Sequence, residues 1–169
     1  MRTQLIGLLA VALLVAGCKS SSETSGSTDQ MSTSGNMSSG SMGKAAPGTQ
    51  ADLAQNVGDR VFFDYDRVEL SPEARATLDR QAAWMKKYGT VSVTVEGHCD
   101  ERGTREYNIA LGARRANAVK SYLVALGVGA GRVGTISYGA ERPAVLGTGE
   151  TVWAQNRRGV TVVVGNAGS

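Results

Sequence analysis

The sequence predicts an α+β domain in which helices pack on a mixed sheet of about four strands, in the order β-α-β-α-β, then a short helix and a last strand. Short runs rich in β-branched and aromatic residues alternate with longer segments whose apolar residues recur at helical spacing. Helix-capping residues mark where the longer segments begin and end. Helices that lie between strands indicate crossover connections packed on a sheet.

The first strand and helix come early in the domain. Residues 60–64, Arg-Val-Phe-Phe-Asp, form a run that favours β-structure. Ser71 and Pro72 predict a helix start, because serine accepts from free helical N–H groups and proline suits the first helical position. Apolar residues then recur at helical spacing to about residue 87. Residues 91–96 alternate apolar and polar, which predicts a half-buried strand.

A long helix is predicted to follow Thr104, its cap, and to end at Gly127. The apolar face of this helix is expected to include Tyr107, Leu111, Ala118, Tyr122 and Leu126. The remaining elements are a strand at residues 132–138, a short helix at 149–156 and a final strand at 159–164.

The N-terminal segment, residues 1–17, reads as a signal peptide. Its apolar run is too short to span a bilayer but suits a signal-peptide core. Small residues precede Cys18 and resemble the bacterial lipobox, in which the signal peptide is cut just before a cysteine. That cysteine becomes the N-terminus and carries N-acyl and diacylglycerol lipid. An ordinary cleavage site with an incidental cysteine is the alternative. Because Lys19 rather than aspartate follows Cys18, the resemblance implies the outer membrane, with the domain facing the periplasm.

Residues 18–50 read as the lipidated cysteine and a flexible tether, and residues 51–169 as one folded domain. The tether consists mostly of Ser, Thr, Gly, Met and Gln, a composition that cannot bury enough apolar surface to offset the entropy of ordering. Its methionines suggest metal binding as an alternative. Their irregular spacing and the lack of a neighbouring histidine favour the tether.

The overall charge and the single histidine exclude several classes of function. A net charge of +3 gives no support for nucleic-acid binding. His98, Cys99 and Asp100 are adjacent and suggest catalysis at first sight, but neighbours in an extended chain point to opposite sides. One histidine in the whole chain rules out a multi-histidine metal site. We therefore expect a protein that is not an enzyme and holds no metal or cofactor, with His98 packed and hydrogen-bonded inside the fold.

Residues 96–123, EGHCDERGTREYNIALGARRANAVKSYL, closely resemble the OmpA-like peptidoglycan-binding domain. The resemblance extends over residues 60–164 and includes the segments at 61–64, 137–139, 142–143 and 156–158. It implies non-covalent binding of peptidoglycan and protein partners in the Tol envelope and cell-division system, including TolB. An interaction hub held by Tol proteins, without direct wall binding, is the alternative.

Asp100 and Arg115 are the leading candidates for the binding site. Asp100 follows a strand in a loop closed by Gly103, and its carboxylate can accept from an ammonium group. Arg115 lies four residues after Leu111 on the inward helix face, and its guanidinium can bind a carboxylate through two hydrogen bonds. Such a pair suits a zwitterion. The resemblance implies the same two residues and the free end of meso-diaminopimelate in a stem peptide. A structural Asp100–Arg115 salt bridge without a ligand is the alternative.

Further candidates for the pocket wall lie in three segments: Phe63, Asp64 and Asp66 at the end of the first strand, Asn108 and Leu111 on the long helix, and Arg157 and Arg158 before the last strand. For the two arginines, a solvated basic turn is an equal alternative. Cys99 departs from the family, where Thr or Ala is usual. We expect it to be a small, partly buried residue, with redox sensitivity as the alternative.

Overall fold

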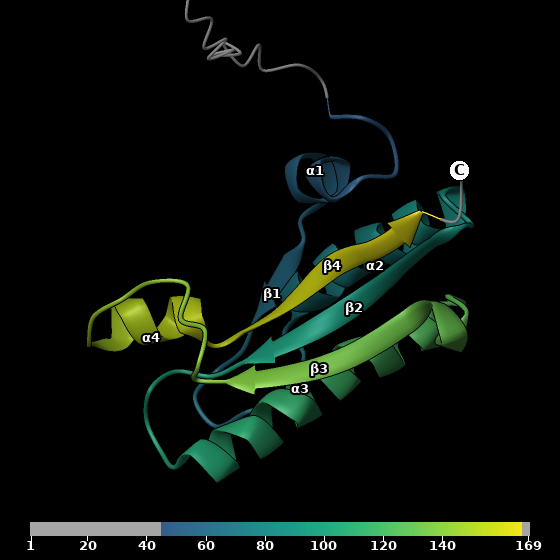
Figure 1. Cartoon of the computed structure of the whole chain (residues 1–169). Helices are drawn as coiled ribbons and strands as arrows, with labels where there is room; N and C mark the ends of the chain where they lie inside the picture. The colour runs from purple at the N-terminus through teal and green to yellow at the C-terminus, as the bar shows by residue number, and fades with distance from the viewer. Residues whose placement is uncertain (1–44, 167–169) are drawn as a thin grey trace, which may run out of the picture. The chain divides into compact units, whose positions relative to one another are not determined.

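A four-stranded mixed sheet forms the centre of the fold, with the strand order β1-β4-β2-β3 (Figure 1). Strands β2 and β3 pair in parallel, whereas β4 is antiparallel to both β1 and β2. The predicted α+β class and mixed sheet are therefore confirmed. The strands are β1 (Arg60–Phe62), β2 (Val91–His98), β3 (Val133–Gly139) and β4 (Arg158–Asn166).

The computed structural model describes residues 45–166, so the signal peptide, Cys18 and most of the predicted tether lie outside the described residues. The fold already includes residues that the sequence assigned to the tether. The N–H of Gly48 donates to the buried Asp52 carboxylate at 2.9 Å, and Thr49 caps the short helix α1 (Gln50–Asp52). A π-helical turn, η1 (Leu53–Val57), follows. Within residues 45–166, no helix is long and apolar enough to cross a membrane.

Helices α2 (Pro72–Lys87) and α3 (Arg105–Ala125) cover one face of the sheet (Figure 1). Ser71 and Thr104 cap them as predicted, each accepting from a backbone N–H in the first turn at 3.2 Å. The predicted apolar face of α3 needs a correction, because Tyr107 is 44% exposed and its hydroxyl donates to a surface carboxylate. Leu111 is buried as predicted, and Tyr122 and Leu126 are partly buried against the core. The inward face also carries Asn108, Gly112, Arg115, Ala116, Val119 and Leu123.

The core lies between the sheet and these two helices. Alternation along β2 turns Val91, Val93 and Val95 toward the helices, where all three are buried. The helix α3 approaches the end of β2 so closely that a Cβ on Gly97 would overlap the carbonyl group of Gly112. The close approach of Gly97 and Gly112 fixes how near α3 lies to the end of β2.

Strands β1 and β2 both run antiparallel to β4, and β3 runs parallel to β2. These three strands therefore point the same way and finish at the same end of the sheet. A 3₁₀ turn, η2 (Ala130–Arg132), precedes β3, and the predicted short helix is α4 (Glu150–Asn156). Figure 1 shows α4 at the end of the sheet where β2 and β3 finish. The loops that follow β1 and β2 therefore meet the residues that precede β4.

Candidate functional site

A pocket of about 140 Å³ lies at this end of the sheet. It is built from the loops after β1 and β2, the first turns of α3 and the residue between α4 and β4. It contains Asp100 and Arg115, so the structure brings the two leading candidates into one pocket. Its lining consists of Tyr65, Asp66, Cys99, Asp100, Arg102, Gly103, Tyr107, Asn108, Leu111, Arg115 and Arg157.

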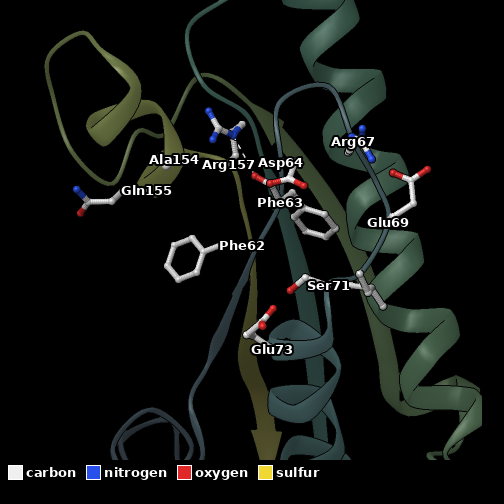
Figure 2. A pocket seen from close by; sticks show the side chains of 11 residues that line it. Phe62, Phe63, Asp64, Arg67, Glu69, Ser71, Glu73, Ala154, Gln155 and Arg157 are labelled. Carbon is white, nitrogen blue, oxygen red and sulfur yellow. Dashed lines mark hydrogen bonds between the residues drawn. The ribbon is translucent and has the colours of Figure 1, made fainter.

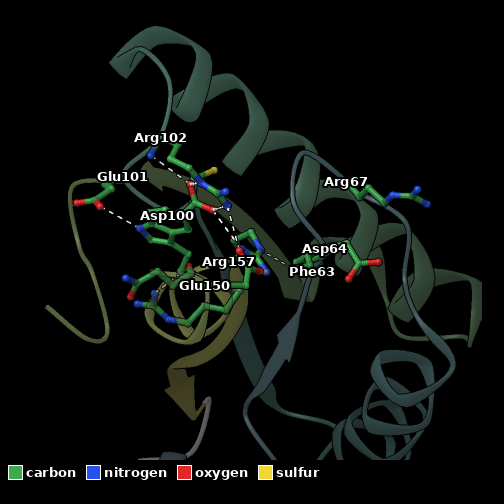
Figure 3. Close-up of polar contacts among 12 residues, drawn as sticks. Phe63, Asp64, Arg67, Asp100, Glu101, Arg102, Glu150 and Arg157 are labelled. Carbon is green, nitrogen blue, oxygen red and sulfur yellow. Dashed lines mark hydrogen bonds and ion pairs between the residues drawn. The ribbon is translucent and has the colours of Figure 1, made fainter. Parts of the chain in front are cut away.

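The carboxylate of Asp100 is buried and bound by two arginines (Figure 3). Arg102 donates from Nη2 to Oδ2 at 2.6 Å and from Nε to Oδ1 at 3.1 Å. Arg157 donates from Nη1 to Oδ2 at 3.3 Å. Burial opposes ionisation of Asp100, but the hydrogen bonds from Arg102 and Arg157 outweigh it and hold its pKa below the ordinary value. Asp100 is therefore an anion with cationic partners.

Arg115 is fully buried and holds three backbone carbonyl groups together. Its guanidinium donates to the carbonyls of Arg67 and His98, both at 2.9 Å, and of Asp64 at 3.0 Å. These carbonyls belong to the loop after β1 and to the end of β2. Burial lowers the pKa of Arg115. Among the described residues its hydrogen bonds go to these carbonyls and to the Cys99 sulfur, so an Asp100–Arg115 salt bridge is not formed.

Arg157 links the two sides of the pocket. Its Nε donates to the carbonyl of Phe63 at 3.0 Å and its Nη2 to the Glu150 carboxylate at 2.6 Å. Both Arg157 and Arg158 are buried, so a solvated basic turn is wrong for this pair. Arg158 lies outside the pocket and donates to the carbonyls of Asn156 and Arg142.

The sequence did not single out Arg102, whose guanidinium lies in the middle of the site. It lies 4.0 Å from the ring of Tyr65 and 4.1 Å from the ring of Trp153. The indole N–H of Trp153 in turn donates to Glu101 at 2.9 Å, which ties α4 to the β2–α3 loop. The position of Arg102, two residues after Asp100, could have predicted that these two side chains pair. The aromatic partners come from distant segments and gave none.

The loop that carries Asp100 is fixed from within. Asn108 donates from Nδ2 to the carbonyl of Arg102 at 3.0 Å, and Gly103 takes the left-handed φ of +95° that lets the chain turn into α3. On the facing loop, Asp66 also has a positive φ and accepts from the hydroxyl of Tyr107. Asp66, Asn108 and Leu111 therefore line the pocket as the sequence suggested.

Phe63 and Asp64 line a different and larger groove, of about 510 Å³ (Figure 2). Arg157 is shared by both cavities, so the groove begins where the smaller pocket ends. Its lining is mixed in polarity: Phe62, Phe63, Asp64, Arg67, Glu69, Leu70, Ser71, Glu73, Ala154, Gln155 and Arg157.

His98 and Cys99 are both enclosed by the fold. His98 is packed inside the fold as expected, beside Tyr138 with ring centroids 5.6 Å apart. Neither of its ring nitrogens has a hydrogen-bond partner among the described residues, so the expected hydrogen bonding by this side chain is wrong. Burial, together with Arg158 and Arg142, lowers the pKa of His98 to about 4. The Cys99 thiol donates to the carbonyl of Asn108 at 3.3 Å, and burial raises its pKa. No cluster of three or more potential metal ligands occurs in the described part of the chain.

The fold and this pocket define a class of protein. Residues 62–157 match the OmpA family, and the chain belongs to that family. A solved structure, the peptidoglycan-associated lipoprotein from Burkholderia pseudomallei, aligns with a TM-score of 0.61 and 41% identity, over 62% of this chain and 89% of that one. The C-terminal domain of MotB from Helicobacter pylori aligns with a TM-score of 0.60 at 22% identity, over 64% of this chain and 86% of that one, a likeness of fold alone.

Relatives narrow the class further. A peptidoglycan-associated lipoprotein from Rhizobium meliloti is 57% identical over 75% of this chain and 72% of its own length. One from Agrobacterium fabrum is 47% identical over 93% of this chain and 85% of its own length. Within the OmpA family, the chain therefore groups with the peptidoglycan-associated lipoproteins. These relatives are named for a lipid and for peptidoglycan, not for a catalytic activity.

Proposed function

We propose that the chain is an outer-membrane lipoprotein whose domain binds peptidoglycan non-covalently, through the diaminopimelate end of a stem peptide. The observation that carries the proposal is the pocket that holds both Asp100 and Arg115. It combines a buried anion with guanidinium groups, which suits a ligand that carries an ammonium and a carboxylate. The names of the relatives support peptidoglycan as the source of this ligand.

In this proposal the ligand's ammonium group binds Asp100 and its carboxylate approaches Arg115. A guanidinium has five N–H donors. Arg115 directs four of them to the carbonyls of Arg67, His98 and Asp64 and to the Cys99 sulfur. One N–H is left for a ligand carboxylate. The other four contacts hold the positively charged guanidinium in place for it.

The proposed envelope role rests on the predicted lipidation of Cys18 and on the predicted tether. Acyl chains on Cys18 would fix the protein in the outer membrane, since two or more chains hold stably. Tethering raises the effective concentration of the domain near a wall that repeats the ligand, so modest affinity for one stem peptide is sufficient. We place the protein in the Tol-Pal envelope and cell-division system, with TolB and other Tol proteins as partners.

The test is Asp100→Asn in the full-length protein, titrated with a diaminopimelate-containing tripeptide by calorimetry. The substitution keeps the shape but removes the charge that pairs with the ammonium, so affinity should fall by about a hundredfold. Asp79→Asn on α2 is the matched control, because Asp79 pairs with Tyr122 away from the pocket. Equal affinity in a folded Asp100→Asn variant would contradict the proposal. Unchanged pull-down by cell-wall sacculi would favour a hub held by Tol proteins alone.

A further inference from the structure

The position where the proposed ligand's ammonium group belongs already holds a cation in this structure. The guanidinium of Arg102 is stacked between the rings of Tyr65 and Trp153, at 4.0 and 4.1 Å, and contacts both oxygens of the Asp100 carboxylate. Two aromatic faces and one carboxylate form a cage for a cation. The cage is assembled from the loop after β1, the loop after β2 and α4.

The carboxylate of Asp100 already binds two guanidinium groups and has no capacity left for a third cation. A carboxylate offers about four lone-pair sites. Oδ1 accepts from the backbone N–H and from Nε of Arg102, and Oδ2 accepts from Arg102 and from Arg157. A ligand's ammonium group can therefore reach Asp100 only after one of the two guanidinium groups leaves.

Arg102 is the guanidinium that can leave. The Arg157 side chain is only 6% exposed and is held by the Phe63 carbonyl and by Glu150 (Figure 3). The Arg102 side chain is 28% exposed, and beyond Asp100 its nearest acidic group is Glu150 at 3.8 Å. The loop itself stays in place without the Arg102 side chain, because Asn108 binds the Arg102 carbonyl and Asp100 binds the Arg102 N–H.

We propose that Arg102 is an internal occupant of the site, and that the ligand binds by exchange, its ammonium group displacing the Arg102 guanidinium from Asp100, Tyr65 and Trp153. The identity of the ligand rests on the function proposed above. The exchange makes Arg102 a specificity-determining residue. Arg102 contacts Asp100 through two N–H groups, whereas a ligand with only an amine would replace them by a single contact. A ligand that also brings a carboxylate for the remaining guanidinium groups therefore displaces Arg102 more efficiently.

The first test compares Arg102→Ala with the wild-type full-length protein in a titration with the diaminopimelate tripeptide. Because the variant spends no binding energy on displacing an internal cation, its affinity should rise by about five- to tenfold. Arg105→Ala is the matched control: it removes the same charge three residues on, where Arg105 pairs with Glu141 outside the pocket, and should leave affinity unchanged. Arg102→Gln serves as a second variant. Equal or weaker binding by both folded Arg102 variants would overturn the exchange.

The second test examines the cage without any peptidoglycan fragment. Methylguanidinium, titrated into Arg102→Ala and followed by NMR, should shift the indole N–H of Trp153 and the ring signals of Tyr65. Wild-type protein and Arg102→Ala/Asp100→Asn should show no saturable shift. A variant that ignores methylguanidinium would overturn the inference even if the tripeptide binds. Conversely, wild-type and Arg102→Ala proteins that both ignore the tripeptide would overturn the proposed function, and methylguanidinium alone would then decide whether the cage is a cation site.

Discussion

Arg115 is a structural residue as well as a candidate binding residue. Charge on an inward helix face was a sound signal, because a buried cation needs partners. The sequence could not show that these partners are main-chain carbonyls, since the loops that supply them come from distant segments. The same limit explains why Arg102 and Trp153 were not predicted. A local pattern locates Asp100, but the cage around Arg102 exists only after the loops that follow β1 and β2 have met α4.

Replacement of Arg115 should therefore affect stability first. Arg115→Met leaves the carbonyls of Asp64, Arg67 and His98 without donors in a buried place. We expect a loss of about 3–5 kcal/mol in the free energy of unfolding, measured in urea. Arg114→Met, at an exposed neighbouring position, should cost less than about 0.5 kcal/mol. Similar stabilities for the two variants would show that the carbonyl contacts contribute little.

His98 should make the fold sensitive to mild acid. Its pKa is about 4 in the folded protein, whereas an unfolded histidine titrates near 6.5. Between these values the unfolded chain binds more protons, so stability falls as the pH falls below about 6.5, by roughly 2 kcal/mol at pH 4.5. The carboxylate of Glu96 lies 3.5 Å from Nε2 of His98. The lowered pKa is caused by burial and by the positive charges of Arg158 and Arg142.

The measurement is urea unfolding at pH 7.5 and pH 4.5 for the wild-type protein and for His98→Phe. Carboxylates away from residue 98 titrate in the same way in both proteins, so the difference between the two isolates the histidine. The variant should lose less stability on acidification. An equal loss in both proteins would mean that His98 takes up its proton without cost in the folded state.

At the scale of elements, the capped helices and the alternating strand were readable from sequence, and α1 and η1 were not. Ser71, Thr104 and the alternation along β2 act locally, so their signals survive in the sequence. The short α1 has too few residues for a periodic pattern, and its stability comes from contacts between Asp52 and Trp84 at 2.8 Å and Gly48 at 2.9 Å. The contact with Trp84 joins segments 32 residues apart, and a contact of this kind leaves no periodic trace in the sequence.

The close contact between β2 and α3 should be intolerant of any side chain. A Cβ on Gly97 would overlap the Gly112 carbonyl, which is backbone and cannot move without shifting α3. Gly97→Ala should therefore cost at least about 2 kcal/mol in the free energy of unfolding. Gly131→Ala is the control, because a Cβ at Gly131 meets no atom within 4 Å. Differential scanning calorimetry would check both, and a similar Tm for the two variants would contradict the tight contact.

At the scale of the whole molecule, the pocket is built from segments far apart in the sequence. The chain enters the folded domain at a distance from this pocket. The pocket draws on the loops after β1 and β2, on α3 and on the residues before β4. The family resemblance implied that Asp100 and Arg115 share one site, and they line one pocket, whereas the candidates Phe63, Asp64 and Arg158 lie outside it. The alternation of strands and helices predicted the sheet. Pairing order and loop geometry depend on the packing of the complete domain, which is why the second groove beyond Arg157 had no counterpart in the sequence.

The chain enters the domain beside β4, where the Gln50 side chain bonds the backbone of Thr161 and Val163, whereas the pocket lies at the start of that strand, at Arg157. In the proposed role, tension between membrane and wall would pull on these two points. The line of force would then run along the strands, and the hydrogen bonds between β1, β4 and β2 would be loaded in shear rather than peeled apart one at a time. Under that geometry many bonds must yield together, so the fold is suited to act as a mechanical link.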